Sequence, residues 1–550
     1  MLEDKNGTTG LENIGRKYLR TIHRHYSTGM LYEEAVRNRE GMIAHLGPLV
    51  TRTGHFAELP TADRYVVLTR EHRDSVKWSE SLRGLSDEQF QNLFARLVSY
   101  MQNKEAYVQN FFATTHPDYK VPVRVVTEKA WHALYTRNMF IPVHDREVLD
   151  AFEPHFTIAH APGFQAIPEV DGTRSSSFVI MHLSQRVIFI GGTAYAGELR
   201  NAVYSILNYL LPPEKVFPLR GSSNIGEKGD VALFMGRKGT GKTSLAVHPE
   251  RRLFGDYGHG WTEEGLFRFG RGVYARVLDL DPETQPELHD CTRRFGAILE
   301  NVFIDPETGR VDLADRSLTD NVRVAFPNSH LPAHTTDETT GHPQNIFLLT
   351  KDAYGVLPPI AKLAPEQAVY AFLSSYTSVF PETMGQPREP APQFSTCFGT
   401  CPLSILPHEY AMMFMDRVRE NRVTCWIMNT GWIGEPFGAC ERIPLAMSRS
   451  LADAALSGAL DKVEFEEDPV FHFLIPKSCP DPDVPDDSLN PRNVCADPGE
   501  YEMRANRLAE EFMRDFSRFG EKMPENVRNM LSSVLLIDDM LDMSDMGFGL

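Results

Sequence analysis

One stretch of this chain constrains its fold more than any other, because it carries a complete phosphate-binding loop. The pattern G-x-x-x-x-G-K-[ST] is met by Gly236, Arg237, Lys238, Gly239, Thr240, Gly241, Lys242 and Thr243. The glycines let the backbone turn tightly enough for its N–H groups to surround phosphate oxygens. The pattern predicts that Lys242 reaches the terminal phosphates of a nucleoside triphosphate and that the hydroxyl of Thr243 binds Mg²⁺. A chance match in a chain of this length has a probability of roughly a few per cent.

The residues around this loop agree with that interpretation. The apolar run 231–235 predicts a buried strand that enters the loop, and residues 243–246, with Ser244 at the nucleotide, open a helix whose N-terminus faces the anion. A second short apolar run, residues 252–255, ends at Asp256. A strand beside the loop would hold this carboxylate near the magnesium ion, so Thr243 and Asp256 are the candidate metal ligands. The alternative for Asp256 is an ordinary turn residue.

Composition limits the classes of partner. The chain has 550 residues and a formal net charge of −18, which predicts two large lobes and argues against a nucleic-acid partner. No window of about eighteen apolar residues is present, so no membrane span is expected. The acidic N-terminus lacks the apolar segment of a secretory signal. Seven scattered cysteines, of which only Cys397 and Cys401 lie close together, favour reduced thiols in a cytoplasm and offer no zinc site.

Periodicity and turn residues predict an alternation of helices and strands, without an internal repeat. Helices are expected in residues 1–50, 85–113, 202–211 and 500–519, strands at 65–68, 121–126, 178–183 and 187–190, and a surface excursion at 476–499. The expected domains are an N-terminal, substrate-side lobe at 1–219, a nucleotide-binding lobe at 220–520 and an acidic, methionine-rich tail at 521–550.

Several ordered motifs resemble those of the ATP-dependent phosphoenolpyruvate carboxykinases. They are Gly226–Asp230, Gly255–Trp261, Leu299–Val302, Asn321–Arg323, Asp352–Pro359 and Asn429–Trp432, and the likeness covers about residues 31–520. The resemblance implies a two-lobed α/β fold, with a mixed α/β N-terminal lobe, a P-loop C-terminal lobe and a mobile cleft. The family converts oxaloacetate and ATP into phosphoenolpyruvate, CO₂ and ADP, a reaction of gluconeogenesis.

The nucleotide half of the family's residues is retained. The loop matches, although Arg237 and Lys238 replace smaller residues, and Asp256 matches the first acid of the family's Gly-Asp-Asp motif. The resemblance places Glu300 and Arg442 near the nucleotide, puts Ser448 where the family has an adenine-side Thr, and has Arg323 contact substrate and terminal phosphate. ATP and Mg²⁺ are therefore the expected cofactors.

The oxaloacetate half is not retained. Leu59 stands where the family has an arginine for the substrate carboxylate, and leucine cannot make a guanidinium–carboxylate contact. The family holds a second metal, typically Mn²⁺, with a Lys, a His and an Asp, and the positions here are Asn201, Arg220 and Tyr257. Because an arginine would repel the ion, a second metal is doubtful. Arg200 and Arg220, together with Arg323, are the candidate cationic groups for an anionic acceptor, unless the first two are surface or ion-pair arginines. The predicted catalytic set is Lys242, Arg323, Asp256, Arg220 and Arg200.

Three functions stay open on the sequence. The chain is a phosphoenolpyruvate carboxykinase that compensates for its substitutions, a phosphotransferase for another acceptor, or a non-catalytic ATP-binding pseudoenzyme that regulates a partner. The acidic segment 538–546 is a hint of such a partner. The acceptor is a small molecule, with oxaloacetate one candidate, or a protein, and the sequence leaves the oligomeric state open.

Overall fold

The structure is a computed structural model, and it describes residues 19–54, 63–72, 76–77, 82–379, 390–399, 403–520 and 525. Two compact units are present. Unit 1 takes Met1–Pro218, Arg252–Thr340 and Pro402–Ile405, and unit 2 takes Leu219–Arg251, Gly341–Cys401 and Leu406–Leu550. This division differs from the contiguous lobes expected from the sequence, because residues 252–340 return to the unit of the N-terminal segment. Asp256, Glu300 and Arg323 therefore share a unit with Arg200 and not with the phosphate loop.

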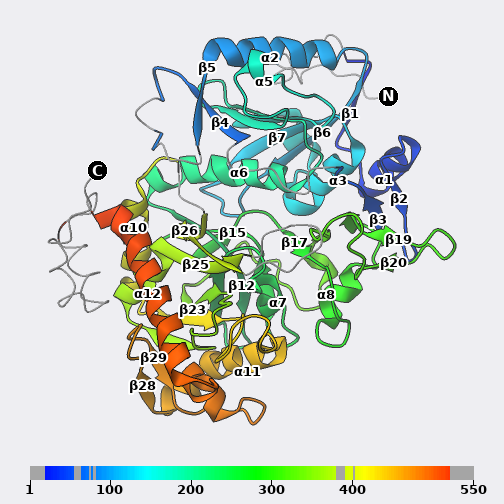
Figure 1. The fold of residues 1–550 in the computed structure, drawn as a ribbon. Helices are drawn as coiled ribbons and strands as arrows, with labels where there is room; N and C mark the ends of the chain where they lie inside the picture. The colour runs from blue at the N-terminus through cyan, green and yellow to red at the C-terminus, as the bar shows by residue number, and fades with distance from the viewer. Residues whose placement is uncertain are drawn as a thin grey trace. The chain divides into compact units, whose positions relative to one another are not determined.

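Unit 1 is built on a mixed sheet with helices on both faces (Figure 1). Its strand order is β1 (Thr21–Arg24), β6 (Glu105–Phe112), β7 (Pro122–Thr127), β9 (Phe156–Ala161), β11 (Val187–Gly191), β10 (Phe178–His182), β4 (Arg64–Leu68) and β5 (Arg83–Ser86), with β8 (Ile141–Pro142) beside β6. The pairs β6–β7 and β10–β11 are antiparallel. Almost every residue of the central strands is buried, as expected for a sheet covered on both sides.

Side-chain alternation explains how the two faces are covered. In β11, Val187 and Phe189 join the apolar cluster under α2 (Asp87–Tyr100), while Ile188 and Ile190 join the cluster under α3 (Ala130–Met139) and α6 (Gly197–Leu210). Successive strand residues point to opposite faces of the sheet. A strand that is apolar at every position therefore contributes side chains to the apolar clusters on both faces. Figure 1 shows α2 and α6 on the two sides of this sheet.

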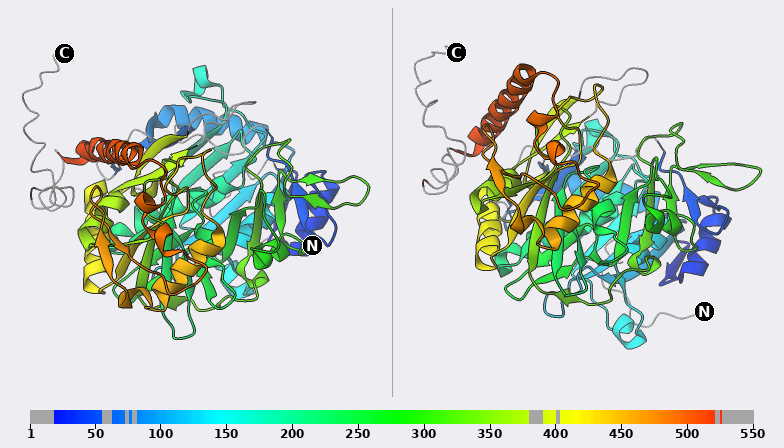
Figure 2. Two further views of the ribbon diagram at one scale, coloured as in Figure 1. Left: turned by 60° about the horizontal axis from the view of Figure 1, so that its bottom comes forward. Right: turned by 90° about the horizontal axis from the view of Figure 1, so that it is seen from below.

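A second sheet of unit 1 carries Arg323 and Glu300. Its order is β17 (Gly272–Arg276), β21 (Arg323–Pro327), β18 (Ile298–Glu300), β3 (Leu49–Thr51) and β2 (Gly41–Ile43). The helix α1 (Thr28–Arg37) packs beside β2, in blue in Figure 2. Unit 1 also holds α4 (Arg146–Asp150), α5 (Pro168–Asp171), α8 (Pro286–Cys291), β14 (Arg252–Gly255), β15 (Gly258–Trp261), β16 (Leu266–Arg268), β19 (Phe303–Ile304), β20 (Val311–Asp312) and β22 (Thr339–Thr340).

Unit 2 is organised around three buried parallel strands, β13 (Val231–Gly236), β23 (Pro343–Thr350) and β27 (Thr424–Asn429). The order continues outward to β12 (Phe217–Ile225) on one side and to β24 (Ala361–Leu363), β29 (Leu474–Pro476) and β28 (Phe465–Glu467) on the other. Its helices are α7 (Lys242–Ala246), α9 (Pro365–Leu373), α10 (Pro407–Glu420), α11 (Leu445–Leu456) and α12 (Pro498–Gly520).

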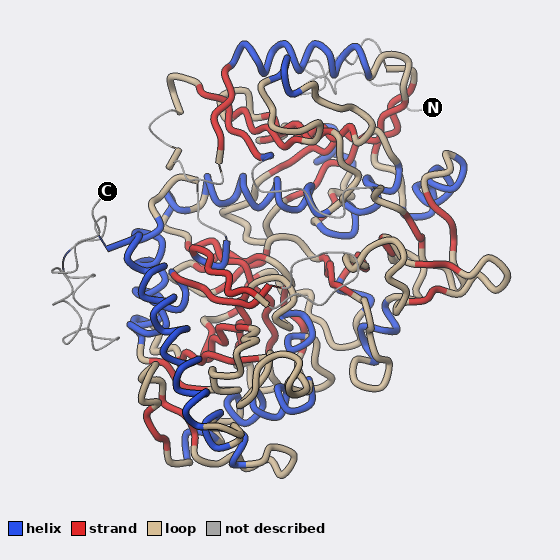
Figure 3. The backbone as a smooth tube through the Cα atoms, viewed as in Figure 1, coloured by secondary structure: helices blue, strands red, loops and turns tan. Residues whose placement is uncertain are grey.

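The last of these helices, α12, packs on the antiparallel hairpin of β25 (Ser374–Val379) and β26 (Ala391–Thr396) (Figure 3). Its buried residues recur with helical spacing at Tyr501, Ala505, Leu508 and Phe512. The ring of Phe512 lies 4.9 Å from that of Phe394 on the hairpin.

The expected strands at 65–68, 121–126, 178–183, 187–190 and 231–235 are confirmed, as are the helices at 202–211 and 500–519. Residues 476–499 contain short 3-10 turns, consistent with a surface excursion.

Two helical predictions are wrong in part. The helix expected over 85–113 ends at Tyr100, and residues 105–112 form β6, paired on both sides with β1 and β7. Of the described part of 1–50, only 28–37 is helical, and β1, β2 and β3 take up much of the rest. Strand pairing across the sheet overrides local helical spacing in both places.

The acidic tail 526–550 lies outside the described residues. Among the helices that the structure does describe, none is long and apolar enough to cross a membrane.

Candidate functional site

The phosphate loop of unit 2 follows β13 as the sequence predicts. A Cβ atom on Gly236 would lie 2.6 Å from Thr240 Oγ1 and 2.9 Å from Leu349, so only glycine fits at the start of the loop. Gly239 and Gly241 have φ angles of 82° and 94°, in the left-handed region that favours glycine. The two turns bring the chain from β13 directly into α7, which begins at Lys242.

Hydrogen bonds from side chains to carbonyl oxygens of the loop fix its conformation. The ammonium of Lys242 donates to the carbonyl oxygens of Gly236 and Arg237, each at 2.7 Å. Thr240 Oγ1 donates to Arg237 O at 2.8 Å, and Thr430, just after β27, donates from Oγ1 to Thr240 O at 3.1 Å. The lysine charge is therefore kept over the loop, where the pattern expects the terminal phosphates.

The remaining nucleotide candidates of unit 2 surround this loop unequally. Arg442 donates from Nε to Thr430 O at 2.6 Å and from Nη2 to Gly239 O at 3.4 Å, so it lies against the loop as expected. Arg237 donates to the hydroxyl of Ser395 on β26, and Lys238 is exposed at the tip of the loop.

Ser244 and Ser448 lie on helices beside the loop. Ser244 is in α7, where its carbonyl accepts a 3.1 Å bond from Arg449. Ser448 is buried in α11, and its hydroxyl donates to Pro444 O at 3.4 Å within its own helix. This hydroxyl would have to leave that bond to contact an adenine.

Two motif residues of unit 2 turn out to brace the loops next to the site. The buried carboxylate of Asp352 accepts the N–H groups of Val356 and Leu357, at 2.8 and 3.0 Å, and the hydroxyl of Tyr376 at 2.9 Å. Asn429 Oδ1 in turn accepts the N–H of Asp352 at 3.0 Å. These side chains fix the loop after β23 against the end of β27, so their place in the motifs is structural.

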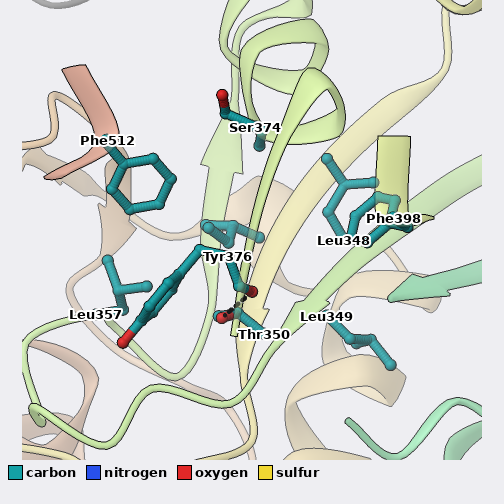
Figure 4. A pocket seen from close by; sticks show the side chains of 10 residues that line it. Leu348, Leu349, Thr350, Leu357, Ser374, Tyr376, Phe398 and Phe512 are labelled. Atoms are coloured by element: carbon teal, nitrogen blue, oxygen red, sulfur yellow. Dashed lines mark hydrogen bonds between the residues drawn. The ribbon is translucent and has the colours of Figure 1, made fainter. Parts of the chain in front are cut away.

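Figure 4 shows a small apolar cavity in unit 2, lined by Leu348, Tyr376 and Phe512 among others. Thr350 Oγ1 donates to Tyr376 O across it at 2.9 Å. Its volume is about 20 Å³, which suffices for about one water molecule and not for a nucleotide. The cavity is therefore no part of the candidate site.

Unit 1 gathers a separate cluster of arginine, tyrosine and carboxylate side chains. Arg200, on α6, places its guanidinium carbon 3.6 Å from the ring centre of Tyr257 and 5.0 Å from that of Tyr274. Its Nη1 lies 3.9 Å from Asp256 Oδ2, which also accepts the Tyr274 N–H at 3.3 Å. The guanidinium carbon of Arg323 lies 4.8 Å from the centre of the same Tyr274 ring. The fold thus brings Arg200, Asp256 and Arg323 around one tyrosine.

Strand register explains where Glu300 lies. It pairs with Arg323 across β18 and β21, and its carboxylate accepts the Tyr274 hydroxyl at 2.7 Å. The side chain is fully buried. Burial raises the pKa of Glu300 to about 7, against the opposing effects of the Tyr274 hydrogen bond and of the Arg323 and Arg200 charges. Within unit 1, Glu300 therefore supports this cluster from inside, and its expected place near the nucleotide stays a prediction.

Comparison with known proteins identifies the family. The family model described as phosphoenolpyruvate carboxykinase matches residues 20–486. The phosphoenolpyruvate carboxykinase (ATP) of Geotalea uraniireducens is 42% identical over 531 residues, which are 96% of this chain and 100% of that protein. Proteins of the same name from Moorella thermoacetica and Thermus thermophilus are 43% and 42% identical, over 94% of this chain and 98% of their own length. The chain belongs to the phosphoenolpyruvate carboxykinase (ATP) family.

The residues at the family's second-metal positions do not fit a metal ion. In unit 1, the Tyr257 hydroxyl donates to Asn201 Oδ1 at 2.5 Å, beneath the guanidinium of Arg200. The third position, Arg220 on β12 of unit 2, has no lone pair to offer. A phenol and an amide bonded to each other, with a cation stacked above, replace the anionic and imidazole ligands that Mn²⁺ prefers. Leu59, the counterpart of the carboxylate arginine, lies outside the described residues.

One other group of residues offers metal-ligand spacing in the described part of the chain, at His23, Glu34 and Glu105 of unit 1. Arg20 pairs with Glu105 at 2.7 Å, and Arg37 pairs with Glu34. Each carboxylate therefore already has a cation, and this group is a hydrogen-bonded charge network.

Glu300 should make stability depend on pH in a way that a glutamine would not. The pKa of Glu300 is about 7 in the folded protein and 4.5 when unperturbed. The stability that protonated Glu300 contributes to the fold is therefore fully present below pH 4.5 and is lost as the pH rises to 7. The difference amounts to about 3 kcal/mol at most. We expect Glu300→Gln to lose less stability than the parent between pH 5 and pH 8 in urea unfolding. Exposed Glu307→Gln is the control, and parallel pH profiles for Glu300→Gln and the parent would contradict the assignment.

Proposed function

We propose that this chain binds Mg²⁺–ATP and transfers its terminal phosphoryl group to an anionic acceptor without the second metal ion of its family. The observation that carries the proposal is the Tyr257–Asn201 hydrogen bond beneath Arg200, which takes up two of the three second-metal positions. The retained phosphate loop supports the nucleotide half.

The nucleotide is held by unit 2. The N–H groups of the loop and the ammonium of Lys242 bind the phosphates, Thr243 offers its hydroxyl to Mg²⁺, and Arg442 supports the loop from the side. A magnesium ion held there would supply positive charge against the negative charge that develops on the phosphates. Asp256 is the second proposed ligand of that ion, and since it belongs to unit 1, this pairing rests on the family resemblance.

The acceptor is held by the arginine cluster of unit 1. Arg323 is buried and Arg200 nearly so, and both guanidinium groups lie by the ring of Tyr274, with Asp256 3.9 Å from Arg200. Two guanidinium groups in a partly dry environment favour an acceptor with carboxylate or phosphate oxygens. They also stabilise negative charge on the acceptor oxygen as it attacks the phosphorus atom. Arg220, on β12 of unit 2, is the third proposed cation for the acceptor, and its part in this site rests on the family resemblance alone.

The family reaction itself should be impaired. In the relatives' reaction the resemblance assigns the second metal to the enolate that forms as CO₂ leaves oxaloacetate. Guanidinium groups stabilise such charge without inner-sphere coordination, so several kcal/mol of stabilisation are absent. This corresponds to a rate lower by roughly 10²- to 10³-fold.

The test compares this chain with the Geotalea uraniireducens enzyme in phosphoenolpyruvate formation from oxaloacetate and ATP, with Mg²⁺ alone or with added Mn²⁺. We expect formation at least roughly 10²-fold slower for this chain, without stimulation by Mn²⁺. Lys242→Ala serves as the inactive control. Rapid, Mn²⁺-stimulated turnover that disappears in Lys242→Ala would show that other residues hold the second metal.

A second assay separates transfer from binding alone. Consumption of ATP in the presence of small di- and tricarboxylates or phosphorylated acids identifies the acceptor class. If Mg²⁺–ATP binds and none of these acceptors accelerates its consumption, the transfer half of the proposal fails. The chain would then be a nucleotide-binding member of the family that acts through a partner.

A further inference from the structure

Unit 1 contains a cavity of about 270 Å³ that is lined by none of the residues of the arginine cluster described above. Five segments form it: the chain around β6 and β7, β8, the end of β16 with the turn that follows it, the 3-10 helix Asn328–His330, and residues 334–338. Three cations line its wall, Lys120, Arg268 and Arg271, against a single acidic side chain, Glu338. The cavity is therefore strongly biased toward an anion.

Arg268 is held rigidly in the wall. Its Nη1 donates to the carbonyl oxygens of Phe254 and Thr335, both at 3.0 Å, and its Nη2 donates to Thr336 O at 3.2 Å. The residue is 6% exposed, and its buried Nε has no hydrogen-bond partner within the described parts of the chain. Neutral carbonyls fix the orientation of this guanidinium but leave its charge uncompensated.

Arg271 repeats the arrangement three residues later. Its Nε is also buried without a hydrogen-bond partner in the described residues, and its Nη2 donates a long bond, 3.5 Å, to Arg137 O. Burial and the Arg137 charge lower the pKa of Arg271, and burial together with the Arg271 charge lowers that of Arg268 to about 10. Like charges held together in a desolvated place cost free energy.

Nearby carboxylates offset this cost only in part. In the described residues, no ion pair within 4.0 Å includes Arg137, Arg268 or Arg271. The charges of Asp337 and Glu338 favour the charged form of Arg268, but the Asp337 carboxylate accepts the Thr335 hydroxyl at 2.6 Å and Glu338 is exposed. Lys120, which also lines the cavity, is exposed as well, with its ammonium 5.4 Å from the ring centre of Phe112.

We propose that this cavity binds a compact, doubly charged oxyanion, a phosphate monoester or a small dicarboxylate, at a site distinct from the phosphate loop and the Arg200–Arg323 cluster. Its volume lies just below the range of pockets for drug-sized ligands, so the ligand is small. Guanidinium and ammonium groups bind phosphate and carboxylate oxygens by charge-assisted hydrogen bonds, and Arg268, Arg271 and Lys120 line this cavity together.

The test is calorimetric titration of the full chain with inorganic phosphate and, separately, with malonate, at constant ionic strength. The Lys242→Ala background removes binding at the phosphate loop. We expect Arg271→Gln to weaken binding of the preferred anion by roughly 10- to 100-fold, the loss of one charge-assisted hydrogen bond. The matched control is Arg252→Gln, an exposed arginine of β14, which should leave the affinity unchanged. The stronger of the two anions identifies the ligand class.

A second readout places the anion. Phosphate or malonate should protect the backbone amides of residues 328–338 from hydrogen exchange, and Arg271→Gln should abolish that protection. Should Arg271→Gln fail to fold, Arg271→Lys keeps the charge, removes the planar fork and should weaken binding by a smaller factor. The proposal is overturned if a folded Arg271 variant binds both anions as tightly as its parent, or if neither anion protects this segment.

Discussion

Replacing Lys242 by alanine should lower the affinity of this chain for Mg²⁺–ATP by roughly 100-fold or more. The ammonium is fixed over the loop by bonds of 2.7 Å to two carbonyl oxygens. Because the side chain is already ordered, binding the terminal phosphates costs little side-chain conformational entropy. Each charge-assisted hydrogen bond to phosphate contributes about 1.5–3 kcal/mol, and the lysine can make more than one. Calorimetric titration with Mg²⁺–ATP measures the loss directly.

The matched control for this experiment is Lys238→Ala, at the exposed tip of the same loop. It removes the same charge four residues away, and we expect a loss of less than about tenfold, as for an exposed, solvent-screened charge. Equal losses in the two variants would mean that the loop attracts ATP only through its net charge. An unchanged affinity in Lys242→Ala would move the nucleotide site away from this loop altogether.

Replacing Asp352 by alanine should destabilise unit 2 by about 3–5 kcal/mol. The carboxylate is fully buried, and its removal leaves the N–H groups of Tyr354, Val356 and Leu357 without the acceptor they share. Each buried donor without a partner costs about 1–3 kcal/mol, so these three losses together account for the expected size. A lower midpoint of urea unfolding, monitored by tryptophan fluorescence, measures the effect.

The exposed Asp416 of α10 provides the comparison, since Asp416→Ala should change stability by less than about 0.5 kcal/mol. Asp352→Asn tests the geometry further. One amide oxygen can replace only one of the two carboxylate oxygens, and the amide N–H groups would then face other donors. An Asn variant as stable as the parent would show that the hydrogen bonds at Asp352 contribute little.

The phosphate loop and its flanking strand were predictable because their determinants are local. Gly236, Gly239 and Gly241 are required by backbone geometry, and Lys242 and Thr243 follow at fixed offsets. The strand at 231–235 is a continuous apolar run of the kind that a sheet buries on both faces. The family motifs added the list of substituted ligands, which is a property of sequence positions alone.

Strand β6 shows where local patterns fail. Residues 105–112 carry polar and aromatic side chains without clear alternation, and this pattern predicts a continuation of the preceding helix. The chain leaves that helix after Met101 through Asn103, at a φ of 59°, and β6 then finds partners on both sides. Those partners, residues 21–24 and 122–127, are set by long-range pairing, which a local window does not contain.

The division of the chain into units also depends on distant pairing. The expectation of a contiguous C-terminal lobe rested on chain order, but residues 252–340 belong to unit 1. The β17–β21–β18 sheet of that segment pairs with β3, more than two hundred residues earlier. Which strands pair at such distances depends on which sheet edges remain unpaired as each sheet forms. The composition of the segment does not indicate that pairing.

The sequence by itself determined the family and the phosphate loop, and it predicted the replacement of the second-metal ligands, because each depends on residue identity at fixed spacing. The tertiary structure alone decided what replaced those ligands: the Tyr257–Asn201 hydrogen bond, the stacking of Arg200, and the burial of Glu300 behind Tyr274. It also revealed the cavity lined by Arg268 and Arg271, which no motif indicated. These features join side chains from separate strands and helices, and their charges and pKa values depend on burial, which exists only in the folded chain.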